Sequence, residues 1–521
     1  MSPTLSHWYE LYGRHISRRD FLRVGRDVAG LLALASLPGD AVAEARATAN
    51  PFTLGVASGD PVPDGVVLWT RLDAGAIGHV TATSVQWEVA TDDRFRRIVR
   101  RGSRVAPAAL GYSVHAEVDR LEPGREYWYR FMTGGQVSAV ARTRTAPPAD
   151  ASNDRVRFAF ISCQNYEHGY YTAFRHLAEE PVDAIVHLGD YIYEKRFASA
   201  PAVREHEAGE VFTLDQYRAR YALYRADPDL QAAHSVCPWI VTNDDHEVAN
   251  NWAGPFAEDT SVPQDQFLLR RAAAFQAYYE FMPLRRTSLP HGPWMQIYRR
   301  LEFGRLLRFH VLDTRQFRSD QACGDGSKPR CADVFDSKRT MMGPEQERWL
   351  AEGLRRSPAR WNVLANQVMI AQTKRLARGE PVFSMDKWDG YVPARDRLMT
   401  LLGDPRVSNP VVVTGDIHTN WVADLKMDYD DAKSAVVGAE FVGTSMTSGG
   451  DGTDADTSRV QALNPHVKFF NARRGYVTVD VTPSRCTSTY RCVPYVSRPG
   501  APIETSGTFV VEDGRRGVQA G

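Results

Sequence analysis

The sequence has no excess of charge of either sign. Its 521 residues include 63 lysines and arginines and 63 aspartates and glutamates, so its formal net charge is zero. A balanced chain has no bulk attraction for nucleic acid or for an anionic membrane surface. We therefore expect no nucleic-acid partner. Local charged sites are still compatible with this balance.

Long apolar runs are also missing, except near the N-terminus. The segment 17–23 reads Ser-Arg-Arg-Asp-Phe-Leu-Arg, an apolar stretch covers 28–37, and Ala41-Val42-Ala43 follows. This order of basic, apolar and small residues is typical of a secretory signal, and the paired arginines before Phe-Leu indicate a twin-arginine signal. An amphipathic surface helix is the alternative. We predict a signal peptide over 1–43, export by the twin-arginine translocase, and a periplasmic or secreted protein without stable membrane insertion.

Cysteine is scarce, with six in the chain. Cys323 and Cys331 flank one short loop, and Cys486 and Cys492 flank another short stretch. In an oxidising compartment both pairs could form local disulfides. Cys237 is interpreted as a small buried hydrophobic residue.

The chain has no internal repeat and no low-complexity tract, and its length favours two domains. Residues 44–147 contain short runs rich in Val, Trp and Tyr between Gly, Pro and Asp turns, which predict a small all-β, fibronectin-like sandwich. A polar, proline-bearing linker begins at Ala146. We expect the second domain to cover 155–515.

In the second domain, buried strands alternate with helical segments. We predict strands over 156–162, 183–188, 239–242, 306–312, 361–366 and 410–414, and helices near 170–180, 213–225, 264–280, 344–356 and 393–402. This alternation predicts an α/β (α+β layered) domain with central β-sheets and flanking helices.

Polar residues follow each predicted strand. In chain order the strand ends lead to Ser162-Cys163-Gln164-Asn165, Gly189-Asp190, Asp244-Asp245-His246, Asp313-Thr314-Arg315, Asn366-Gln367 and Gly415-Asp416-Ile417-His418. A single acid at a strand end is an ordinary turn residue. Acids and histidines at several ends of one sheet converge on one edge, where close carboxylates repel each other unless a cation compensates. The pattern therefore predicts a metal site.

The motifs at these ends resemble those of one family. The stretches SCQNY, HLGDYIYE, DDHEVANNW, ANQ, TGDIHTNW and EFVGTSMTSGG are similar, in order and context, to motifs of PhoD-type alkaline phosphatases. That family is distantly related to purple acid phosphatases and other calcineurin-like metallophosphoesterases. The resemblance implies a metallophosphoesterase sandwich preceded by the small β domain. It covers the whole chain. Asn243 departs from the tryptophan expected there.

The resemblance implies a secreted metal-dependent alkaline phosphatase. Such an enzyme hydrolyses phosphate monoesters with metal-activated water at a dinuclear or multinuclear centre. A phosphodiesterase or phospholipase-D-like hydrolase with the same centre is the alternative. A non-catalytic β-sandwich binding protein with a degenerate hydrolase domain is a third hypothesis, and the intact acids and histidines argue against it.

The resemblance also implies the ligands of an iron ion. Asp190 matches the aspartate that bridges two metals in this superfamily. We also predict that Asp190 is a catalytic residue. Cys163, Tyr193 and His418 would bind Fe³⁺ through thiolate, phenolate and imidazole. A buried inert cysteine at 163 and a packed aromatic at 193 are the alternatives.

The second metal would have oxygen ligands. Asp245 and Asp416 match positions occupied by Asn and His in purple acid phosphatases, and two aspartates favour Ca²⁺ over zinc or manganese. Asn366 and Gln367 are possible further contacts, and the sequence does not separate them. Asn165 is a possible contact with substrate phosphate.

His246 is the second predicted catalytic residue, with a nearby acid such as Asp244 or Glu247 holding its imidazole protonated. We interpret Tyr191 and Glu194 as packing and surface residues. The segment 495–511 is a possible cover for the site, in which a small phosphate ester would bind.

Overall fold

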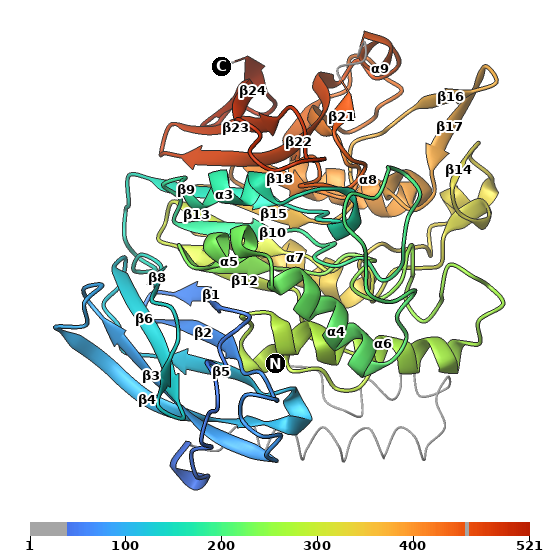
Figure 1. The fold of residues 1–521 in the computed structure, drawn as a ribbon. Coiled ribbons are helices and arrows are strands. Elements are labelled where there is room, and N and C mark those ends of the chain that lie inside the picture. The colour runs from blue at the N-terminus through green and yellow to red at the C-terminus, as the bar shows by residue number, and fades with distance from the viewer. Residues whose placement is uncertain (1–38, 454–457, 521) are drawn as a thin grey trace. The chain divides into compact units, whose positions relative to one another are not determined.

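The computed structural model describes residues 39–453 and 458–520 (Figure 1). The predicted signal peptide, except for its last residues, lies outside this part of the chain. By contacts, the chain forms two compact units. Of the described residues, the first unit contains those up to Ala146 together with Ala208–Val241 and Pro255–Gln296, and the second contains Pro147–Glu207, Thr242–Gly254 and those from Ile297 onward.

The first unit contains a β-sandwich. One sheet has the order β4-β3-β6, with β7 and β8 also paired to β6, and the other has the order β11-β1-β2-β5. Apolar residues of β2 and β5 share one core with those of β3 and β6, among them Leu68, Ala116, Val85 and Tyr129. The strands are β1 Val56–Val62, β2 Gly65–Arg71, β3 Ala82–Ala90, β4 Ile98–Pro107, β5 Ser113–Val118, β6 Glu126–Thr133, β7 Gln136–Val137, β8 Ala141–Arg144 and β11 Trp239–Val241.

The helices of the first unit come from the later part of the chain. They are α4 Leu214–Arg225, α5 Pro228–His234 and α6 Gln264–Phe281. α4 begins with a capping box, in which Gln216 N donates to Thr213 Oγ1 and Thr213 N donates to Gln216 Oε1. Chain order had suggested that these segments belong to the second domain. The short 3₁₀ helices of this unit are η1 Gly39–Ala41, η2 Ala108–Leu110 and η4 Arg286–Ser288.

The second unit contains two sheets that share one long strand. The first sheet has the order β12-β13-β15-β18-β20-β19-β22, in which β13, β15, β18 and β20 run parallel. The second has the order β10-β9-β22-β23-β24-β25, in which β9 and β10 run parallel. The first half of β22 belongs to one sheet and its second half to the other. Phe158 of β9 packs edge-on against Phe309 of β13, so the two sheets are in contact there.

The strands of the second unit are β9 Val156–Ile161, β10 Ala184–His187, β12 Arg299–Phe303, β13 Leu307–Val311, β14 Ser327–Lys328, β15 Trp361–Asn366, β16 Arg375–Ala377, β17 Glu380–Ser384, β18 Pro410–Thr414, β19 Asn420–Lys426, β20 Val436–Val442, β21 Gly452–Thr453, β22 Val467–Val481, β23 Arg485–Val493, β24 Glu504–Glu512 and β25 Gln519–Ala520. Its helices are α3 Thr172–Ala178, α7 Gly343–Arg355, α8 Val392–Gly403 and α9 Ser458–Leu463, with 3₁₀ helices η3 Tyr166–His168, η5 Ala322–Gly324, η6 Ala332–Phe335 and η7 Trp388–Gly390. α7 and α8 share a core with β15 and β18 through Leu350, Leu398, Leu364 and Val412.

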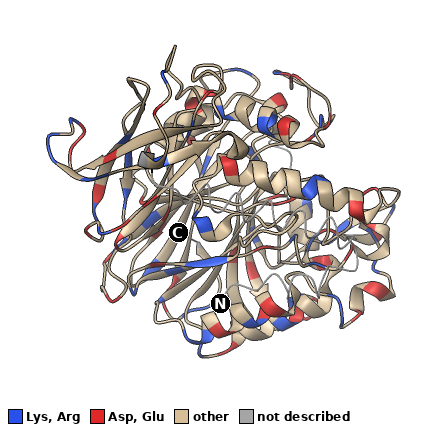
Figure 2. Cartoon of the chain, turned by 90° about the horizontal axis from the view of Figure 1, so that it is seen from below, with Lys and Arg blue, Asp and Glu red and all other residues tan. Residues whose placement is uncertain are grey.

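The fold is mixed α/β with large sheets, as predicted. Each of the six strands and five helices expected from the sequence is present, with ends within a few residues of the predicted ones. The described part of the chain contains no helix that is both long and apolar enough to cross a membrane. Basic and acidic residues are interspersed along helices and strands alike (Figure 2).

One of the two possible disulfides is present. Cys323 and Cys331 are bonded. Cys486 and Cys492 are free and buried, so the second possible disulfide is absent. Both lie on β23 rather than on the two arms of a hairpin, and six residues of extended strand separate their Cα atoms by about 20 Å, whereas a disulfide needs about 6 Å.

The segment 495–511 is bound to the second unit along its length. Its second half belongs to β24, which pairs along its length with β23. The first half is anchored at Asp451, whose carboxylate accepts hydrogen bonds from the backbone N–H groups of Val496 and Ser497 at 2.7 and 2.8 Å.

Candidate metal centre

The polar strand ends of the second unit meet at one place. The loop after β9 carries Cys163, the loop after β10 carries Asp190, and the loop after β18 carries Asp416 and His418. The segment 242–247 brings Asp244, Asp245 and His246 to the same place. Three overlapping groups have ligand atoms within 4.8 Å of one another: Cys163, Asp190 and His418; Asp190, Asp245 and His246; Asp244, Asp245 and Asp416.

Gly189 allows two of these loops to touch. Its φ of +110° is a conformation that side chains rarely adopt, and a Cβ atom at this position would overlap with the backbone and Cβ of Asp244. The loop after β10 is also bonded to the loop after β9, because Cys163 N donates to Gly189 O at 3.1 Å. Asp190 is thereby fixed between Cys163 and Asp244.

Several candidate ligands have left-handed backbone conformations. The φ angles of Cys163, Asp190, Asp416 and His418 lie between 58° and 66°. This conformation costs a residue with a side chain roughly 1–2 kcal/mol. Such strain persists only where the surrounding structure enforces it, and it concentrates at functional sites. Four residues that follow strand ends have this left-handed conformation, which supports a functional role for the place where they meet.

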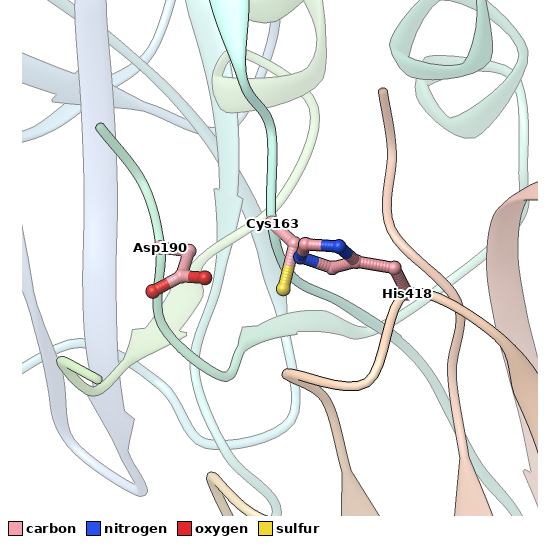
Figure 3. Close-up of side chains that lie close together, drawn as sticks. All are labelled: Cys163, Asp190 and His418. Atoms are coloured by element: carbon pink, nitrogen blue, oxygen red, sulfur yellow. The ribbon is translucent and has the colours of Figure 1, made fainter. Parts of the chain in front are cut away.

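The first group combines sulfur, oxygen and nitrogen donors (Figure 3). Cys163 and Asp190 are almost fully buried, whereas His418 is half-buried. Tyr193 belongs to the same group, because its hydroxyl lies 3.0 Å from Asp190 Oδ2 and 3.2 Å from His418 Nε2. Ser448 Oγ donates to the Tyr193 hydroxyl at 2.7 Å and fixes the phenol in this orientation.

Burial determines the protonation of these donors. It raises the pKa of the Cys163 thiol and of the Tyr193 phenol, and the negative charge of Asp190 raises both further. A metal ion reverses this balance because it stabilises the thiolate and the phenolate. A thiolate, a phenolate, an imidazole and a carboxylate fit a ferric ion.

The remaining groups consist of carboxylates, with His246 as an additional member of one of them. Burial raises the pKa of Asp190, and Asp245 and Asp244 add to the rise. Asp244 Oδ2 has no hydrogen-bond partner among the described residues, although it is buried. A hard cation with oxygen ligands, such as Ca²⁺, fits three converging aspartates. Asp190 belongs to a group of each kind, as expected for a bridging carboxylate.

Two basic side chains, Arg315 and Lys387, already compensate part of this negative charge. Arg315 Nε donates to Asp244 Oδ1 at 2.6 Å, and its two terminal nitrogens donate to Asp386 at 2.8 and 2.9 Å. Lys387 forms an ion pair with Asp416. Asp313-Thr314-Arg315 was noted as a strand end, but nothing in the sequence pointed to Arg315 or Lys387 as part of the site.

His246 lies beside the candidate metal ligands, and its Nδ1 atom is already hydrogen-bonded. Its Nδ1 lies 2.7 Å from Glu194 Oε2, and its Nε2 lies 4.0 Å from Asp245 Oδ2. Burial lowers the pKa of His246, but Asp245, Asp190 and Glu194 outweigh burial and leave it well above its usual range. These acids therefore favour the protonated imidazolium, in which Nε2 carries a proton.

Two sequence-based interpretations of acids near His246 are wrong. Glu194 is fully buried and holds His246, so it is not a surface residue. Asp244 and Glu247 do not hold the imidazole: Asp244 pairs with Arg315, and Glu247 accepts from Tyr191 N at 2.6 Å and Asp244 N at 2.8 Å. Glu247 instead ties the loop after β10 to the segment 242–247.

The amide side chains differ in their freedom to bind a ligand. Gln367 is fully used, because its amide donates to Thr242 Oγ1 and Leu312 O and its Oε1 accepts from Thr314 Oγ1. Asn366 Oδ1 and Asn165 Nδ2 are buried and have no hydrogen-bond partner among the described residues. Of the pair that the sequence left open, Asn366 keeps an oxygen without a partner among the described residues, and Gln367 stabilises the strand ends.

The geometry agrees with the comparisons to known proteins. The sequence model of the PhoD-like phosphatase matches residues 158–490, and that of the PhoD-like phosphatase N-terminal domain matches 39–147. Alkaline phosphatase D of Bacillus subtilis (strain 168) is 47% identical over 517 residues, which cover 96% of this chain and 88% of that protein. A solved structure of PhoD is 48% identical and superposes with a TM-score of 0.88, over 91% of this chain and 92% of that one.

Proposed function

Because the chain belongs to the PhoD-like phosphatase family and is a phosphoric ester hydrolase, we propose that it is an exported alkaline phosphatase that hydrolyses phosphate monoesters at a centre of iron and calcium. The observation that carries this proposal is the junction at Asp190. A thiol, a phenol and an imidazole gather on one side of this carboxylate, and aspartates gather on the other.

The residues divide between the two cations by the chemistry of their donors. Cys163, Tyr193 and His418 would hold Fe³⁺, and Asp190 would bridge to Ca²⁺. Asp245 and Asp416 would hold Ca²⁺, joined by Asp244 and by the free oxygen of Asn366. Bound together, such cations supply the positive charge that activates a water molecule and neutralises the phosphate.

His246 would act on the leaving group. Attack of water on phosphorus breaks the bond to the ester oxygen, and that oxygen needs a proton as it leaves. The Nε2 proton of His246 faces the site, while Glu194 holds Nδ1 and keeps the ring oriented. His246 is therefore the proposed general acid and Glu194 the residue that positions it.

Replacing Glu194 by glutamine is expected to lower kcat by roughly 10- to 100-fold, because the neutral amide stabilises the imidazolium less well. KM should change little, since Glu194 does not face the substrate. Steady-state kinetics on a monoester measure both constants. Glu347→Gln is the matched control, because Glu347 pairs with Arg397 away from the centre. An unchanged kcat in Glu194→Gln would refute the positioning role.

The preferred ester is tested with p-nitrophenyl phosphate and bis-p-nitrophenyl phosphate. We expect kcat/KM for the monoester to exceed that for the diester by at least about tenfold, since a dianion interacts more strongly with two cations than a monoanion does. The reverse preference would favour the phosphodiesterase or phospholipase-D-like alternative. Turnover of neither ester by the metal-loaded protein would contradict the proposed enzymatic function.

Export by the twin-arginine translocase is part of the proposal. The paired arginines Arg18 and Arg19, followed by Phe21-Leu22, support this export route. The twin-arginine pathway carries folded proteins, so the metal ions could be inserted before export. The domain limits expected from the sequence, 44–147 and 155–515, remain proposals, although two segments of the second range, Ala208–Val241 and Pro255–Gln296, lie in the first compact unit. Replacing both arginines by lysine should leave the protein in the cytoplasm on cell fractionation; unchanged export would exclude this route.

A further inference from the structure

Phe197 stands beside the two aromatic residues of the centre. Its ring meets the His246 ring edge-on at 4.8 Å between centroids, and the Tyr193 ring edge-on at 5.7 Å. It is half-buried, and Lys195 Nζ lies 5.3 Å from its centroid. An aromatic side chain that is only partly covered, in contact with the proposed general acid, can contact a ligand at that acid.

Hydrogen bonds hold this aromatic residue in place. Phe197 O accepts from His168 Nε2 at 2.8 Å, and His168 Nδ1 accepts from Gly449 N at 3.2 Å. These two bonds require one neutral tautomer of His168, and burial lowers the pKa of this imidazole, which favours its neutral form. Phe197 is thus anchored through His168 to the loop 443–450, which also holds Tyr193 through Ser448.

The orientation of His246 determines where the leaving group lies. Since Glu194 occupies Nδ1, the ester oxygen must approach Nε2. The organic part attached to that oxygen then extends from the His246 ring. Phe197 is an aromatic neighbour of that ring, and its own ring is nearly perpendicular to it, with an interplanar angle of 75°.

We propose that Phe197 is the specificity-determining residue of a leaving-group subsite, and that it favours monoesters of flat aromatic alcohols over those of alkyl alcohols. This inference rests on the proposed function, because it places the leaving group at His246. Its physical basis is that aromatic rings attract each other by more than the apolar area they bury. A flat ring gains this attraction from Phe197, and an alkyl chain does not.

The test compares phenyl phosphate with propyl phosphate in Phe197→Ala, Phe197→Leu and Phe197→Tyr. We expect the ratio of kcat/KM for the phenyl ester to that for the propyl ester to fall about fivefold in Phe197→Ala, to fall similarly in Phe197→Leu, and to persist in Phe197→Tyr. Phe335→Ala is the control, since Phe335 is 55% exposed and is not part of the centre. Equal losses for both esters would show that Phe197 only supports His246 and would overturn the subsite.

Binding of non-hydrolysable analogues separates the subsite from the chemistry. Calorimetry of the metal-loaded protein with phenylphosphonate and propylphosphonate should give tighter binding of the phenyl compound, and Phe197→Ala should abolish the difference. If wild type hydrolyses neither ester, the proposed function fails, but this comparison still tests the subsite. Equal binding of the two phosphonates to wild type would overturn it.

Discussion

Replacing Asp190 by asparagine is expected to lower kcat/KM for a phosphate monoester by roughly a thousandfold, equivalent to about 4 kcal/mol of transition-state stabilisation. The reason is its place in the centre. Asp190 belongs both to the group with Cys163 and His418 and to the group with Asp245 and His246. Asparagine has the same size but only one oxygen and no charge, so it cannot bridge two cations.

The variant should fold normally. Asp190 is buried among other acids, which disfavours its charged form, so a neutral amide removes repulsion from the metal-free protein. We expect its melting temperature without metal to equal or exceed that of wild type. Asp333→Asn, at an exposed acid of η6, serves as the matched control with unchanged activity. Wild-type activity in Asp190→Asn would refute the bridging role.

Replacing Arg315 by methionine is expected to lower the free energy of unfolding by about 3–5 kcal/mol. Arg315 is fully buried, and its guanidinium bonds to Asp244 on one side and to both oxygens of Asp386 on the other. Burial raises the pKa of Asp386, but Arg315 and Arg318 outweigh burial and hold it below its usual range. Methionine has a similar length and leaves both carboxylates without this cation.

Urea unfolding measures this loss. The quantity compared is the midpoint of the transition that reports on the second unit. Arg356→Met is the control, because Arg356 forms an exposed pair with Glu352 one helical turn away, worth about 0.3–0.5 kcal/mol. Arg315→Lys should fall between the two, since lysine keeps the charge but not the forked geometry. Equal midpoints for the methionine variants at 315 and 356 would contradict this account of the acid cluster.

The sequence predicted the part of the site that depends on chain-local patterns. Apolar runs marked the strands, and parallel strands place their carboxyl ends at one edge. This is why Cys163, Asp190 and Asp416 could be assigned to a common place before the fold was known. The observed strands end within a residue or two of the predicted ends.

Features that depend on tertiary packing were missed. Glu194 looks like a surface acid in HLGDYIYE, and only the fold brings it to His246, 52 residues away. The 71 residues between Asp244 and Arg315 hide their pairing in the same way. No local pattern encodes these two pairings. The second disulfide is absent for a local reason, because Cys486 and Cys492 lie six residues apart on one extended strand, β23.

The central claim is that the loops after β9, β10 and β18 together hold two chemically different cations joined by Asp190. Elemental analysis of the exported, purified wild-type protein by mass spectrometry tests it most directly. We expect iron and calcium together, with about one iron per chain, because the thiol, phenol and imidazole suit iron and the aspartates suit calcium. Zinc alone, with neither iron nor calcium, would contradict this assignment of the ligands.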